Sequence, residues 1–174
     1  MKKKGDIWIS AVLYLGLGVL ALTLILAAGM PLVQKLQDRN VITQTKNLMS
    51  TVDENIRAVT NEGPGSRRFL DPFEVRQGDL YVESNRVRWE LKTSVKLLES
   101  GITLKEGSLT LAENETNIVD EYLMNVYTDY DNIAMLDLDS EYENPFQGIY
   151  SFTITNTGGF DPDSGLPIVK ITIR

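Results

Sequence analysis

The chain has 174 residues, a net charge of −7, and neither cysteine nor histidine. Without cysteine it forms no disulfide and no thiolate metal site, and without histidine it lacks the commonest general base and metal ligand. The acidic balance argues against nucleic acid as a partner, because that binding depends on cationic groups that neutralise phosphates.

The chain opens with a basic cluster and a long apolar run. Residues 2–4 are lysines, Gly5 and Asp6 follow, and no charged residue occurs in 7–33. A helix needs about 20 apolar residues to cross a bilayer, so residues 7–33 are predicted to span a membrane. Because basic residues favour the cytoplasmic side, we expect the N-terminus inside and the rest of the chain outside. Membrane lipid is therefore the first expected partner.

The apolar run contains residue types suited to contacts in a membrane or an assembly. Aromatic rings favour the membrane interface, and small residues let helices approach closely. A proline removes one backbone hydrogen bond and is expected to kink the helix. The candidate contact residues of this segment are Trp8, Ser10, Tyr14, Gly16, Gly18 and Pro31.

The helix is predicted to continue to about residue 62. Residues 34–61 contain neither glycine nor proline, and Gly63-Pro64-Gly65 is a stop signal. Asp53 and Arg57 are assigned to the polar face of this amphipathic part. An apolar stripe at helical spacing predicts packing of the opposite face on a folded domain. The stripe consists of Leu48, Val52, Ile56 and Val59.

After residue 65, short β-rich segments alternate with turn signals. This pattern predicts an antiparallel β-sandwich-like domain over 66–174, and hence an α+β fold. Residues 94–100 could form a short helix in place of β structure. The strand candidates are 69–75, 80–82, 87–92, 102–104, 109–112, 122–127, 133–138, 149–155 and 168–173.

The N-terminus resembles the class III signal peptide of archaeal type IV pilin-like proteins. The matching residues are Lys3, Lys4, Gly5 and Asp6 with the apolar run behind them. The resemblance implies a leader of residues 1–5 that a prepilin peptidase removes between Gly5 and Asp6. It also implies a subunit of a cell-surface filament, with the same chain or other pilin-like subunits as partners.

The resemblance has one departure. Bacterial type IV pilins generally carry glutamate at the fifth mature position, which is Ser10 here. Asp6 is the carboxylate next to the helix start, and two roles stay open for it. It would pair with the amino terminus of a neighbouring subunit, or simply cap the helix in the headgroup layer.

Other sites are few. Asn114 begins an Asn-Glu-Thr sequon and is a candidate for N-glycosylation at an exposed position between strands. Acidic stretches at 137–143 and 161–165 lack the spacing of a calcium loop, so no metal is predicted. We find no catalytic constellation and expect neither an enzyme nor a cofactor. The alternative to a filament subunit is a monomeric, membrane-anchored extracytoplasmic binding module.

Overall fold

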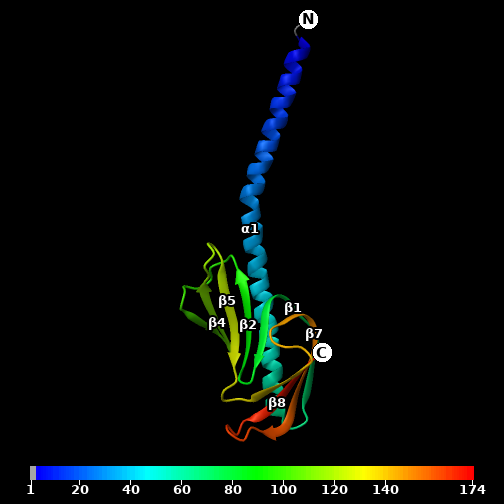
Figure 1. Ribbon diagram of the computed structural model, residues 1–174, viewed down its shortest axis with the longest axis vertical. Coiled ribbons are helices and arrows are strands. Elements are labelled where there is room, and N and C mark those ends of the chain that lie inside the picture. Colours follow the sequence, from blue (N-terminus) through cyan, green and yellow to red (C-terminus); the bar gives the residue numbers. More distant parts are fainter. Residues whose placement is uncertain (1–2) are drawn as a thin grey trace. The chain divides into compact units, whose positions relative to one another are not determined.

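The computed structural model describes residues 3–174, with side chains from Trp8 onward except that of Ile9. Residues 1 and 2 of the predicted leader lie outside the described part. Figure 1 shows one long helix, α1 (Lys3–Glu62). The chain divides into two compact units at a point within this helix. The first unit ends at Arg39, and the second spans Asn40–Arg174 and is called the head below.

Eight strands follow α1 and form a single sheet. Its order is β3-β4-β5-β2-β1-β7-β8-β6, and every neighbouring pair is antiparallel except β6 and β8. The predicted α+β class, a long helix followed by a strand-rich head, is confirmed. The strands are β1 (Arg67–Glu83), β2 (Arg86–Thr93), β3 (Thr103–Glu106), β4 (Leu109–Glu115), β5 (Tyr122–Asp129), β6 (Met135–Ser140), β7 (Phe146–Phe160) and β8 (Pro167–Ile173).

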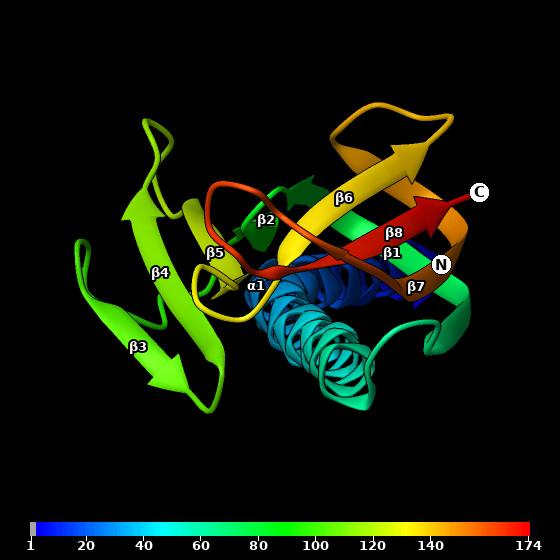
Figure 2. The ribbon, with the colours of Figure 1, turned by 90° about the horizontal axis from the view of Figure 1, so that it is seen from below.

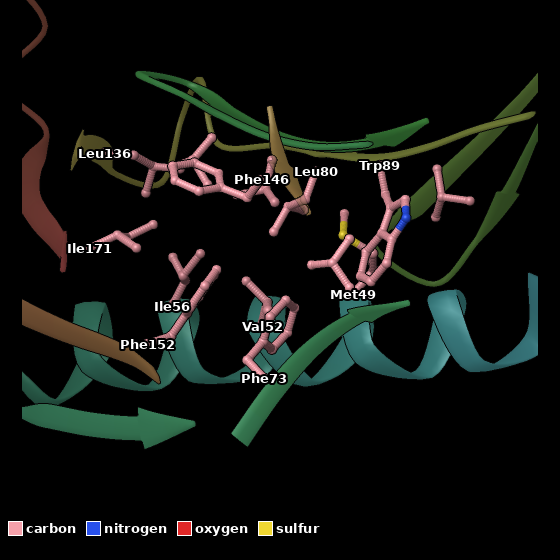
Figure 3. Packing of buried hydrophobic residues seen from close by; sticks show 14 of the residues in the cluster. Met49, Val52, Ile56, Phe73, Leu80, Trp89, Leu136, Phe146, Phe152 and Ile171 are labelled. Atoms are coloured by element: carbon pink, nitrogen blue, oxygen red, sulfur yellow. The ribbon is translucent and has the colours of Figure 1, made fainter. Parts of the chain in front are cut away.

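The sheet curls around the part of α1 that belongs to the head, shown in cyan and teal in Figure 2. At the β6 edge the Leu136 N–H donates to the Ser84 carbonyl at 2.7 Å, which ties this edge back to the turn between β1 and β2. Apolar side chains of the helix and of the concave face share one core (Figure 3). Within it the Phe73 and Phe152 rings stack with centroids 4.3 Å apart.

One strand replaces two of those predicted. Segments 69–75 and 80–82 both belong to β1, because Gln77-Gly78-Asp79 makes an irregularity in the strand rather than a turn. Gly78 has φ of +81°, a conformation that favours glycine. The Trp89 indole N–H donates to the Gln77 carbonyl at 2.9 Å and fixes the irregularity. The bend there lets β1 pair with β2 at one end and with β7 along most of its length.

Residues 94–100 form no helix. The Glu113 carboxylate on β4 is buried, and one of its oxygens accepts the N–H groups of Leu97 (2.9 Å) and Leu98 (3.3 Å). These two bonds anchor the irregular segment to β4.

Candidate functional site

The N-terminal unit presents its apolar side chains to its surroundings. Among the large ones in residues 8–33, the exposed fraction ranges from 49% at Leu26 to 76% at Trp8. Within the described residues, α1 is the one helix long and apolar enough to cross a membrane. A helix that is apolar on every side is normally buried in a bilayer or among other helices.

The two glycines predicted as contact residues have open space around them. A Cβ atom added at Gly16 or Gly18 would meet no atom within 4 Å outside the neighbouring backbone. The chain's own packing therefore does not require glycine at either position. Trp8, Ser10 and Tyr14 are also exposed.

Proline does not end the helix. α1 continues through Pro31 into the head as one helical segment. Gly5 and Asp6 lie within its first turns, and their side chains are outside the described ones. The predicted cleavage site and the predicted role of Asp6 therefore stay predictions.

In the head, α1 provides one wall of the core. Val52, Ile56 and Val59 are buried, with 2%, 0% and 0% of their surfaces exposed, and Leu48 is half-buried. Three further residues of the same helix are buried although the predicted stripe does not include them: Ile42, Thr45 and Met49. Ile42, Met49 and Ile56 are seven residues apart, and this repeat is the signal that identifies the missed positions.

Asp53 is predicted to lie on the polar, solvent-facing side of the helix, and this prediction is wrong. The curled sheet covers more of the helix surface than the apolar stripe alone. Asp53 is 3% exposed, and both of its carboxylate oxygens accept the Arg57 Nε–H at 2.9 Å. Tyr130 lies close by, and its buried hydroxyl has no hydrogen-bond partner among the described residues. Burial, assisted by the Asp53 charge, raises the pKa of Tyr130. The Arg57 side chain is 38% exposed, so the pair joins a buried carboxylate to a half-exposed guanidinium at the edge of the core.

The end of α1 is tied to β7. Asn156 is buried, and its side-chain amide donates to the Val59 carbonyl at 3.0 Å. The Ser66 hydroxyl lies 2.7 Å from that same carbonyl and 2.8 Å from the Gly63 carbonyl. These side chains satisfy a carbonyl that would otherwise lose its partner where the helix stops.

The remaining predicted sites are simple surface features. Asn114 is exposed but lies in β4, opposite Leu123, rather than between strands. The Thr116 hydroxyl of the sequon lies 3.0 Å from the Glu121 carbonyl. The Asp161 carboxylate accepts the Ser164 N–H at 2.8 Å and the Ser164 hydroxyl at 2.6 Å, which lowers the pKa of Asp161. No group of three acidic residues able to hold a metal occurs in the described part of the chain.

Comparison of the chain with protein-family models, curated proteins and solved structures finds no match.

Proposed function

We propose that the chain is a pilin-like structural subunit of an archaeal cell-surface filament. The proposal rests on one observation. An apolar helix, exposed around its whole circumference, continues as one α1 into the core of a separately packed head. Such a helix needs an apolar environment on every side. A bilayer supplies it before assembly, and a bundle of like helices supplies it afterwards.

The proposed mechanism is processing followed by assembly. A prepilin peptidase cuts between Gly5 and Asp6 on the cytoplasmic side and leaves the apolar helix in the product. Asp6 then pairs with the new amino terminus of a neighbouring subunit. The open space at Gly16 and Gly18 supports close approach of neighbouring helices, since no side chain of the same subunit fills it.

The glycines also provide the test. Gly16→Leu and Gly18→Leu add bulk where the isolated chain has room, so membrane insertion and head folding should stay unchanged. Close packing between copies should be blocked, and filaments should disappear from sheared surface fractions seen by electron microscopy. Leu17→Ile is the matched control, because it changes the shape of a side chain in the same helical turn without adding volume.

Two results would contradict the filament. One is a mature protein that stays in the membrane as single copies even when assembly genes are expressed. The other is filament formation that is identical in both glycine variants and in the wild type. Retention of single copies would favour the membrane-anchored binding module, which uses the same helix with lipid as its permanent surroundings. Intact mass of membrane-extracted protein tests processing separately, and retention of Met1 would contradict cleavage.

A further inference from the structure

The face of the head's sheet that points away from α1 has a shallow cavity of about 310 Å³ over β1, β7 and β8. The residues between its lining side chains, such as Phe152, Ile154 and Ile171, are buried in the core. Because side chains alternate along a strand, the lining residues point outward. The cavity is lined by Arg67, Phe69, Thr153, Thr155, Lys170 and Thr172.

Strand register arranges these side chains in two rows. Phe69 lies opposite Thr153, which lies opposite Thr172. In the next row Arg67 lies opposite Thr155, which lies opposite Lys170. With strands about 4.8 Å apart and alternate residues about 7 Å apart, the rows cover roughly 10 by 7 Å. That footprint fits a sugar ring lying flat on the sheet.

Arg67 makes this face attractive to an anion. Among the cationic side chains of residues 40–174, all of which are described, only Arg67 and Lys105 have no carboxylate partner. The Arg67 Nε–H donates to the Thr155 hydroxyl at 3.2 Å, and the guanidinium carbon lies 5.9 Å from the centroid of the Phe69 ring. These two contacts leave the terminal nitrogens of the guanidinium fork available. That fork matches a carboxylate in geometry and charge. Lys170, in contrast, pairs with Asp139 at 3.1 Å.

The neighbouring groups suit the rest of a sugar. The Thr153 hydroxyl lies in the middle of its row and has no hydrogen-bond partner among the described residues, so it is free to bind a ligand hydroxyl. The Phe69 ring is 65% exposed, and the Arg67 guanidinium carbon lies 5.9 Å from its centroid. The rest of the exposed ring surface offers an apolar contact to ring C–H groups. Asp137 and Asp139 lie on β6 at the far side of the two rows and would repel an anion there. The carboxylate must therefore face Arg67.

We propose that this face binds a carboxylate-bearing sugar unit of an acidic polysaccharide. The carboxylate binds Arg67, the ring lies against Phe69, and a sugar hydroxyl bonds Thr153. The inference goes beyond filament assembly and does not depend on it, since all the residues belong to the head.

The test is isothermal titration of the full chain in detergent micelles with tetragalacturonate and with its methyl ester. We expect the acid to bind more weakly as salt rises, and the ester to bind poorly. Arg67→Gln should weaken binding by about tenfold or more, since it removes charge-assisted hydrogen bonds. Thr153→Val and Phe69→Ser should each weaken it several-fold. Lys105→Gln, which removes the other cation without a carboxylate partner, is the matched control and should bind like the wild type.

Several results would overturn the proposal. They are equal binding of acid and ester, unchanged binding by Arg67→Gln, or an equal loss in Lys105→Gln. Arg67 is exposed, so its replacement should not affect folding, and circular dichroism before titration verifies this. If Arg67→Gln reduces self-association of the chain while sugar binding stays the same, the face is a contact between copies and the proposal is wrong.

Discussion

Replacing Ile56 by alanine should strongly destabilise the head. Ile56 is fully buried, and Figure 3 shows it on α1 among the core residues of the sheet. The change removes three carbon groups, worth about 0.8 kcal/mol each, or about 2.4 kcal/mol of transfer free energy. The cavity left between helix and sheet adds to this, so we expect a loss of about 3–4 kcal/mol in the free energy of unfolding.

The measurement is urea unfolding of the full chain in detergent micelles, followed by the fluorescence of Trp89. Trp8 is the only other tryptophan, so Trp8→Phe makes the buried Trp89 the single reporter. Ile149→Ala is the matched control, because Ile149 is 67% exposed and the same truncation there should cost less than about 0.5 kcal/mol. If Ile56→Ala costs no more than Ile149→Ala, α1 is not packed in the sheet as described.

Three further changes test other features of the head by the same unfolding assay. Asn156→Ala should cost about 1–3 kcal/mol, because it removes the buried amide that satisfies the end of α1; a loss near zero would show that water replaces this bond. Gly78 and Gly101 both have φ of +81°, but a side chain at Gly78 would meet the backbone of β2 whereas Gly101 has open space. Gly101→Ala should therefore cost about 1 kcal/mol and Gly78→Ala more than about 2 kcal/mol, and equal losses would contradict the close approach. The hydrogen bond from Lys170 lowers the pKa of Asp139 in the folded protein. The ionised Asp139 carboxylate therefore stabilises the head above the unfolded carboxyl pKa of about 4, and this stability is lost as the pH falls through the lower folded pKa. Asp139→Asn should flatten the dependence of the urea midpoint on pH below about 4, and an unchanged slope would refute this.

The fold class could be predicted because it depends on patterns within single segments. The apolar run, the stripe ending in Val59 and the Gly63-Pro64-Gly65 stop are all local, and α1 ends at Glu62 as the stop requires. Strand alternation is equally local and located most of the sheet.

The errors lie where a distant partner decides the local structure. Gly78 belongs to an irregular strand rather than a turn, because Trp89 on β2 packs against it. Residues 94–100 form an irregular loop that Glu113, on β4, anchors through the N–H groups of Leu97 and Leu98. Asp53 is buried because the sheet curls past the apolar stripe. The cavity at Arg67 likewise depends on register between strands far apart in the chain, which no single segment encodes.

The continuity of α1 has a mechanical consequence. A pulling force on any N-terminal turn travels along the helix to the turns enclosed by the sheet, since no loop lies between them to stretch first. Within the head, Val52, Ile56 and Val59 stand on one helix and share one core, so displacing the helix disturbs their contacts together. Asn156 adds a hydrogen bond to the last turns, which must break in the same event. Tension applied through α1 therefore loads these core contacts and this hydrogen bond at the same time.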